Sequence, residues 1–279
     1  MPATRFAPSP TGRLHLGHAF SALYAYEAAQ DGAFLLRIED IDPVRCRPEF
    51  IAGIEEDLRW LGLSWPQPVR RQSEHLDNYR AAMERLRDMD VVYPCFCTRR
   101  EVAVEVQNAA QAPHEGPDGP VYPGTCRALT ESVRAERLAQ EEANWRLDSA
   151  KVLARTGALH WHDRKRGKIE ARLDDFGDVV IARKDVPTSY HLSVTVDDHL
   201  QGITLVTRGE DLLRSTDIHR YLQALLGYAT PEYEHHALLK NAEGKRFAKR
   251  DKAETLQAMR EAGQTAGEIR ARIAALRMP

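Results

Sequence analysis

Two histidines stand near the start of the chain in the string His15-Leu16-Gly17-His18. The string lies where an extended segment gives way to a helical pattern, and a helix N-terminus offers unpaired N–H groups and a partial positive charge of about +0.5. A phosphate chain binds readily there, and Gly17 lets a ribose or base approach the backbone without a Cβ. Imidazoles can add hydrogen bonds to phosphate oxygens. The string predicts a nucleotide site, although four residues alone also fit a histidine-rich helix start.

A second group that could do chemistry is formed by cysteines. Cys95 and Cys97 are followed, after a loop, by Cys126, whereas Cys46 stands apart and is expected to be a free thiol. Residues 1–13 contain no apolar leader, so we expect a cytoplasmic protein, and in a reducing compartment clustered cysteines more often bind metal than pair. Three thiolates could hold Zn²⁺ at about 2.3 Å. The alternative is a set of free thiols beneath a loop.

Composition limits the scaffold that must position these residues. The chain has 279 residues, of which 43% are hydrophobic and 29% charged, and this suits one large or two moderate globular domains. The formal net charge is −2, so a nucleic-acid partner would have to meet a local basic face. No run of about 18 apolar residues exists, which excludes a membrane-spanning helix.

The elements around the histidine string predict an α/β fold. Extended residues 5–8, a helix over residues 19–30 and an apolar strand over residues 34–39 form a βαβ unit, which favours a parallel sheet. Further segments follow helical or strand spacing. Helices are expected at residues 48–61, 79–89 and 130–142, from Ser215 as cap to Gly227, and from 252 onward; strands are expected at residues 179–183 and 203–207.

A change of composition after residue 94 divides the chain into four predicted parts. Residues 1–94 and 184–250 are expected to form the two halves of a catalytic domain, and residues 251–279 a C-terminal helical segment. Residues 95–183, which contain the cysteines and a loop rich in Gly and Pro at 107–124, are expected to be a smaller inserted subdomain that holds the zinc.

Several blocks resemble one family, the glutamyl- and glutaminyl-type class I aminoacyl-tRNA synthetases. The opening RFAPSPTG and LHLGH is followed in family order by RIEDID with Arg45, DLRWLGLSW, QS, VDDHLQGIT, RGEDLL and Ser215-Thr216. The blocks span residues 5 to about 250. The resemblance implies a class I Rossmann-type parallel sheet that binds ATP through His15, Gly17 and His18.

The resemblance also implies the residues of an amino-acid pocket. Arg5 and Arg208 would face a side-chain carboxylate, Tyr190 would donate a hydroxyl, Glu39 would meet the α-amino group, and Ser9 would lie at the edge. Arginine pairs with carboxylates through a planar fork, so two arginines favour glutamate over glutamine. For any one of these residues alone, an ordinary ion pair is the simpler interpretation.

The second signature of the family is a lysine loop, here read in GKRFAKR at residues 244–250. By alignment Lys249 takes the place of the second lysine and Arg246 that of the first. A lysine can neutralise charge as pyrophosphate leaves, and Mg²⁺ would arrive with ATP. Phe247-Ala248 replaces the usual apolar-Ser pair, so a hydroxyl is missing, and a basic surface turn is the alternative.

Related small glutamate-activating proteins look similar around the cysteines and use a tyrosine as the fourth zinc ligand, which points to Tyr122. His114 is a conventional alternative in the same loop. A closed site with four ligands has no open position, so the zinc would be structural.

Only thirty residues follow Lys249, too few for the helical domains with which full glutamyl-tRNA synthetases read the anticodon. The chain therefore resembles the short paralogues of that enzyme, which activate glutamate without tRNA and transfer it to queuosine in the anticodon of tRNA-Asp. The resemblance implies ATP, L-glutamate and tRNA-Asp as partners of a monomer that binds no membrane.

Two alternative functions stay open at this stage, and so does the role of one group of basic residues. The chain could be an inactive paralogue that binds RNA or regulates, or an acceptor-end synthetase half whose other half is a separate chain. The basic residues Arg164, Lys165, Arg166 and Lys168 could contact tRNA phosphates or form a solvated loop.

Overall fold

The computed structural model describes residues 1–108, 116, 117, 119, 121–239 and 254–277 of the chain. It begins with β1 (Ala3–Phe6), α1 (Leu16–Ala29) and β2 (Ala33–Ile38), and β1 and β2 are parallel. Strand β3 (Arg70–Arg71) continues this sheet beside β2. Gly32 is required at the turn into β2, because a Cβ there would lie 2.0 Å from the carbonyl oxygen of Pro2. The predicted βαβ unit is confirmed.

A second sheet has the strand order β7-β6-β10-β9. Its parallel part consists of β6 (Leu159–Asp163), β10 (Glu232–His236) and β9 (Leu205–Gly209), and β7 (Gly167–Ala171) closes a hairpin against β6. Helix α7 (Tyr190–Leu200) leads into β9, and the 3-10 turn η3 (Glu210–Leu212) and α8 (Ser215–Leu226) connect β9 to β10.

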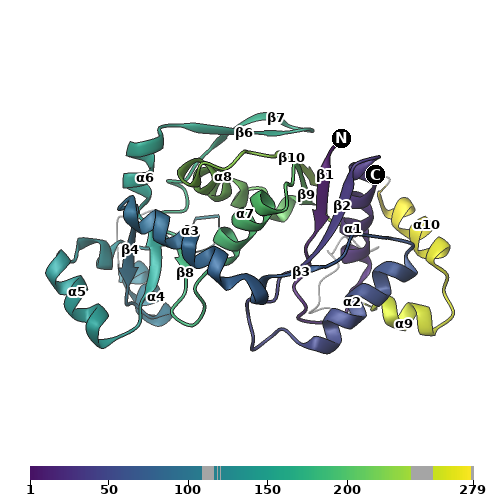
Figure 1. Cartoon of the computed structure of the whole chain (residues 1–279), viewed down its shortest axis with the longest axis horizontal. Helices are drawn as coiled ribbons and strands as arrows, with labels where there is room; N and C mark the ends of the chain where they lie inside the picture. The colour runs from purple at the N-terminus through teal and green to yellow at the C-terminus, as the bar shows by residue number, and fades with distance from the viewer. Residues whose placement is uncertain (109–115, 118, 120, 240–253, 278–279) are drawn as a thin grey trace.

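The two sheets meet where β1 lies beside β9. The backbone N–H of Thr204, just before β9, donates to the carbonyl of Ala3 in β1 at 3.0 Å. From this line the chain crosses in opposite directions, through α1 to β2 and through α8 to β10 (Figure 1). Ligands of open parallel sheets bind outside the carboxyl ends of the strands at such a reversal point.

The third sheet is antiparallel and has the order β4-β5-β8. It contains β4 (Val92–Cys95), β5 (Asn144–Leu147) and β8 (Val180–Ala182), and it is accompanied by α4 (Arg99–Asn108), η2 (Thr125–Ala128), α5 (Glu131–Gln140) and α6 (Ser149–Thr156). These elements lie at one end of the long axis (Figure 1). The boundaries of the inserted subdomain at 95–183 stay a prediction, and within that range β6 and β7 belong to the sheet of β9 and β10.

Two apolar cores support the sheets. One packs α3 (Leu76–Asp88), α7 and α8 against β4, β5, β6, β7 and β10, and α3 follows the short turn η1 (Gln72–His75). The other packs β1, β2, α1 and α2 (Pro48–Trp60) against α9 (Leu256–Glu261) and α10 (Ala266–Arg277). The predicted C-terminal helical segment contains these two helices, and Gly263, with φ of 84°, lies between them.

Most other predicted elements exist with shifted ends. Helix α1 begins at Leu16 rather than residue 19, because His15 itself caps it. The predicted cap Ser215 is the first residue of α8, whose N-cap position is Arg214, whereas Gly227 ends the helix in the left-handed conformation as expected.

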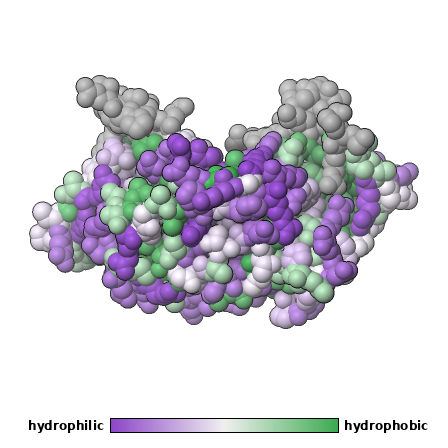
Figure 2. Space-filling model, turned by 90° about the horizontal axis from the view of Figure 1, so that it is seen from above, coloured by the Kyte–Doolittle hydropathy of each residue, from purple (hydrophilic) through white to green (hydrophobic). Residues whose placement is uncertain are grey.

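The surface of the molecule is mostly hydrophilic on the face seen in Figure 2, with apolar areas between the hydrophilic ones. Among the described residues no helix is long and apolar enough to cross a membrane.

Candidate active site

A cavity of about 570 Å³ opens at the point where β1 and β9 meet. It lies at the carboxyl ends of the parallel strands, where the reversal of strand order predicts a ligand. Eight of the residues expected at the nucleotide and amino-acid sites line it together: Arg5, Ser9, His15, Gly17, His18, Glu39, Tyr190 and Arg208. Lys249 and Arg246 lie outside the described residues. Leu238 and Leu239, just after β10, also line the cavity.

The histidine signature forms the first turn of α1. His15 is the N-cap residue, and its Nδ1 accepts the backbone N–H of Gly17 at 3.1 Å. Nδ1 of His18 accepts the backbone N–H of His15 at 3.2 Å, and the two rings lie 3.8 Å apart between centroids. The pair therefore fixes the start of a helix whose N-terminus faces the cavity and suits an anionic ligand.

Arg5 belongs to a buried network of charges. Its guanidinium donates to both carboxylate oxygens of Asp198, at 2.9 and 3.3 Å, and to the carbonyl of Thr207 at 3.3 Å. Arg37, fully buried in β2, donates to Asp198 at 2.8 Å and to Glu39 at 3.3 Å. Two cations and two carboxylates are thus paired within the wall of the cavity.

Arg208, on β9, differs from Arg5 in the chemistry of its partners. It is 6% exposed, and its contacts within the described part of the chain are with neutral groups. It contacts Nε2 of His235 at 3.2 Å, the hydroxyl of Tyr190 and Nδ1 of His219 at 3.3 Å each, and the hydroxyl of Thr216. No carboxylate of the described residues forms an ion pair with it, so none of them offsets its charge by direct contact at the cavity wall.

Shifted acidities agree with this distribution of charge. Burial, followed by the charge of Arg208, lowers the pKa of His219 well below its ordinary value and lowers that of His235 to about 4. Both imidazoles are therefore neutral at neutral pH. Burial raises the pKa of Glu39 above its usual value, although Arg37 and Arg5 oppose the shift, so an incoming ammonium would favour its ionised form.

Sequence reasoning missed four residues that define this electrostatic setting: Arg37, Asp198, His219 and His235. One usable signal existed, since Arg37 interrupts the apolar run of β2 and a charged residue inside a buried strand needs partners. Asp198 stood inside a quoted family block without an assigned role, and no local pattern pointed to the two histidines.

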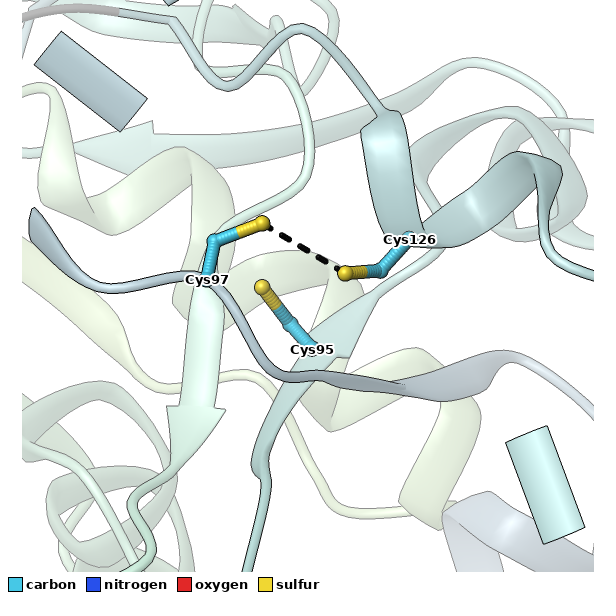
Figure 3. A group of neighbouring side chains, drawn as sticks. All are labelled: Cys95, Cys97 and Cys126. Carbon is cyan, nitrogen blue, oxygen red and sulfur yellow. Dashed lines mark hydrogen bonds between the residues drawn. The ribbon is translucent and has the colours of Figure 1, made fainter. Parts of the chain in front are cut away.

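The cysteines gather as expected at the end of β4. Cys95, Cys97 and Cys126 have sulfur atoms within 4.8 Å of one another, and their thiols point toward a common centre (Figure 3). Sγ of Cys97 lies 3.5 Å from Sγ of Cys126, and the Tyr122 hydroxyl lies 3.5 Å from Sγ of Cys95 and 3.4 Å from Sγ of Cys97. His114 lies outside the described residues.

These spacings suit one tetrahedral ion. Bonds of about 2.3 Å to sulfur and about 2.0 Å to oxygen separate the ligand atoms of such a site by roughly 3.5–3.8 Å. Burial, with the neighbouring thiols Cys126 and Cys95, raises the pKa of Cys97 to about 12. A cation would reverse this preference by stabilising thiolates, and the hydroxyl of the buried Tyr122 lies close enough to two of the sulfurs to be a candidate fourth ligand.

The basic cluster forms the turn of the β6–β7 hairpin. Arg164 pairs with Glu232 at 2.7 Å, Lys165 lies 3.7 Å from Glu234, and Arg166 donates to the carbonyl of His235 at 3.1 Å. These contacts join the hairpin to β10, but Arg164, Lys165 and Arg166 are exposed, so both alternatives for the basic residues, contact with tRNA phosphates and a solvated loop, stay predictions. Lys168 is exposed on β7.

Comparison with known proteins places this geometry in a class. The chain matches the family of class I tRNA synthetases (E and Q), catalytic domain, over residues 2–276. It is 48% identical to a glutamyl-Q tRNA(Asp) synthetase of Rhodobacter capsulatus, covering 96% of this chain and 98% of the relative. It is 44% identical to one of Nocardia farcinica, covering 96% and 82%.

A solved glutamate tRNA ligase from Elizabethkingia meningosepticum, in complex with its amino acid, superposes with a TM-score of 0.74 at 31% identity. The match covers 90% of this chain and 52% of that one, so this chain spans about half of its length. The α/β class I fold is confirmed, and the chain is a ligase of the aminoacyl-tRNA synthetase type, a class that uses ATP with Mg²⁺. Within that class the chain belongs to the glutamyl-Q tRNA(Asp) synthetase family.

The paired part of the charge network gives a prediction of stability. Asp198→Asn would leave Arg5 and Arg37 buried with one shared carboxylate fewer, which we expect to lower the free energy of unfolding by about 3 kcal/mol at pH 7. Urea denaturation measures this change. Asp185→Asn, which removes an exposed partner of Arg183, is the control and should change stability by less than about 0.5 kcal/mol. A similar small loss for Asp198→Asn would contradict the network.

Proposed function

We propose that the chain activates L-glutamate with ATP to glutamyl-adenylate, without tRNA, and transfers the glutamate to queuosine in the anticodon of tRNA-Asp. One observation carries the first half: Arg208, a buried guanidinium with no carboxylate partner among the described residues, faces the same cavity as the histidine signature. The names of relatives that match nearly the whole chain support the second half.

In this proposal Arg208, with the Tyr190 hydroxyl beside it, receives the side-chain carboxylate of glutamate. Arg5 adds positive charge from β1, and Glu39 receives the α-ammonium group, with Ser9 at the edge. The side-chain carboxamide of glutamine carries no charge, so it would leave the charge of Arg208 unmatched in a buried site. The solved glutamate tRNA ligase in complex with its amino acid supports the same class of ligand.

Activation then needs no nucleophile from the protein. An α-carboxylate oxygen attacks the α-phosphorus of ATP, the bond to the bridging oxygen of the β-phosphate breaks, and pyrophosphate leaves with Mg²⁺. His15, Gly17 and His18 hold the phosphates at the start of α1, and Lys249 in the lysine loop neutralises the leaving charge. The contribution of the protein is position and electrostatics.

We propose that Cys95, Cys97, Cys126 and Tyr122 hold one structural Zn²⁺. The support is the short spacing of the three sulfurs and the Tyr122 hydroxyl. The ion would join β4 to η2 and do no chemistry, because four protein ligands leave no open position. We further propose that the protein works in the cytoplasm as a monomer, with tRNA phosphates meeting its exposed basic residues, of which Lys168 is one.

A second candidate function rests on the lysine loop. Phe247-Ala248 replaces the apolar-Ser pair of the family, so an inactive paralogue that binds RNA is the competing proposal.

Exchange and transfer assays separate these functions. The purified chain should catalyse glutamate-dependent ATP–pyrophosphate exchange without tRNA, and no exchange would favour the inactive paralogue. Labelled glutamate should attach to tRNA-Asp that contains queuosine, and periodate pretreatment, which destroys the cis-diol, should abolish attachment. Equal charging of tRNA that lacks queuosine would show an acceptor-end enzyme instead.

Removal of Arg208 should affect the two substrates differently. Arg208→Ala should weaken glutamate activation by roughly 2–5 kcal/mol, equivalent to at least about 30-fold in kcat/KM, because a substrate charge would be left unpaired. The KM for ATP should change by less than about twofold. Exchange kinetics with each substrate varied in turn measure both effects, and Arg183→Ala on the surface is the control. Equal losses for glutamate and ATP would mean that Arg208 is structural.

Metal analysis tests the cluster. The purified protein should contain about one zinc per chain by mass spectrometry, and Cys97→Ser should lose it while Cys46→Ser keeps it. Chelation should lower the thermal midpoint without raising the KM for glutamate, because the cluster lies on β4 and η2, away from the cavity. Zinc-free protein of unchanged stability would refute the site.

A further inference from the structure

Three neighbouring parallel strands each place one polar side chain in a line that ends at Arg208. His235 on β10 stands directly opposite Arg208 on β9 in the register of the sheet, so their side chains are cross-strand neighbours. Asp163 ends β6 on the other side of β10. Oδ2 of Asp163 lies 2.8 Å from Nδ1 of His235, and Nε2 of His235 lies 3.2 Å from Nε of Arg208.

The chemistry of the end groups fixes the proton on His235. The Nε–H of Arg208 can only donate, so Nε2 of His235 must accept. Asp163 accepts, so Nδ1 of His235 must carry the hydrogen. The imidazole is therefore neutral in one tautomer, and its low pKa, set by burial and by the charge of Arg208, agrees with this state.

Asp163 is itself held rigidly. It is fully buried, and its Oδ1 accepts the backbone N–H groups of Lys165 and Arg166 at 2.9 and 3.0 Å, while its Oδ2 also accepts the backbone N–H of His235 at 3.0 Å. The turn of the β6–β7 hairpin thus orients the carboxylate, the carboxylate orients His235, and His235 orients the guanidinium.

The contrast with Arg5 shows the effect of placing the His235 imidazole between a carboxylate and Arg208. Arg5 contacts the carboxylate of Asp198 directly, and this pairs its charge inside the protein. Between Asp163 and Arg208 an imidazole intervenes, so Arg208 receives an oriented acceptor without a carboxylate at contact distance. His219 acts similarly at Nη1 of Arg208, and its other nitrogen lies 3.2 Å from His191.

We propose that His235 and Asp163 are positioning residues for the choice between glutamate and glutamine: they fix Arg208 through a neutral acceptor, and so reserve its charge for the carboxylate of the substrate. This inference rests on the proposed activation of glutamate. It assigns to two residues on β10 and β6, neither of which lines the cavity, a share in amino-acid specificity.

Asp163, His235 and Arg208 form a relay of two hydrogen bonds. Two substitutions of His235 separate its contact with Asp163 from its contact with Arg208. An asparagine side chain reaches the position of Nδ1, so His235→Asn retains a donor toward Asp163 and removes the acceptor toward Arg208. A glutamine side chain reaches the position of Nε2, so His235→Gln retains the acceptor toward Arg208. Exchange kinetics with glutamate and with glutamine, each at saturating ATP, report the consequences for specificity.

We expect His235→Asn to raise the KM for glutamate at least about tenfold and to reduce the kcat/KM preference for glutamate over glutamine at least about tenfold. His235→Gln should keep that preference within about threefold of the native value. The KM for ATP should stay within about twofold in both variants, which separates positioning from general damage to the fold. An unchanged preference in His235→Asn, or equal losses in both variants, would overturn the proposal.

The native protein supplies a test that needs no variant to fold in a native-like state. In ¹⁵N-labelled protein at pH 7, the His235 ring should show a protonated Nδ1 and an unprotonated Nε2. A ring protonated at Nε2, or at both nitrogens, would overturn the relay. Absence of any glutamate exchange by the native chain would refute the proposed function instead, and that assay is independent of the tautomer.

Discussion

A guanidinium buried without a carboxylate partner is expensive for a folded protein, because the desolvated charge lacks the ion that would stabilise it. Within the described residues Arg208 is in this situation: it is almost entirely enclosed, and its contacts are two imidazoles, two hydroxyls and the Tyr233 ring, whose centroid lies 5.7 Å from the guanidinium carbon. Neutral acceptors orient it and relieve part of the desolvation but leave the charge. A negatively charged ligand would complement this charge. The neutral side chains around Arg208 hold its guanidinium in place and leave its charge available to such a ligand.

Two other charged residues of the cavity wall, Arg5 and Glu39, are paired inside the protein. Asp198 on α7 accepts two hydrogen bonds from Arg5 and one from Arg37, which lie on two parallel strands, and Asp197 beside it accepts from Arg70 and the Tyr79 hydroxyl. One pair of acids on α7 therefore joins the sheet of β1, β2 and β3 to α7 and α3. Because those cations are matched and Arg208 is not, selectivity for a carboxylate is concentrated at a single residue, close to the helix start that suits ATP.

Sequence reasoning reached the parts of this arrangement that local pattern encodes. The βαβ unit, the helix after the histidine string and the gathering of Cys95, Cys97 and Cys126 follow from short strings with distinct chemistry. The partnership of Asp163, His235 and Arg208 joins residues far apart in the chain, and only the register of β6, β10 and β9 brings them together. The position of the turn between α9 and α10 was not predicted, because a glycine is only a weak signal of a helix end unless its φ is known.

The most direct test of the central claim is calorimetric titration of the native protein with glutamate and with glutamine under identical conditions. We expect glutamate to bind at least about 100-fold more tightly, a difference of about 2.7 kcal/mol, because only its side-chain carboxylate matches the charge of Arg208. Affinities within about threefold of each other would contradict the proposed role of Arg208, because a buried cation that binds the side-chain carboxylate should bind a carboxamide much more weakly.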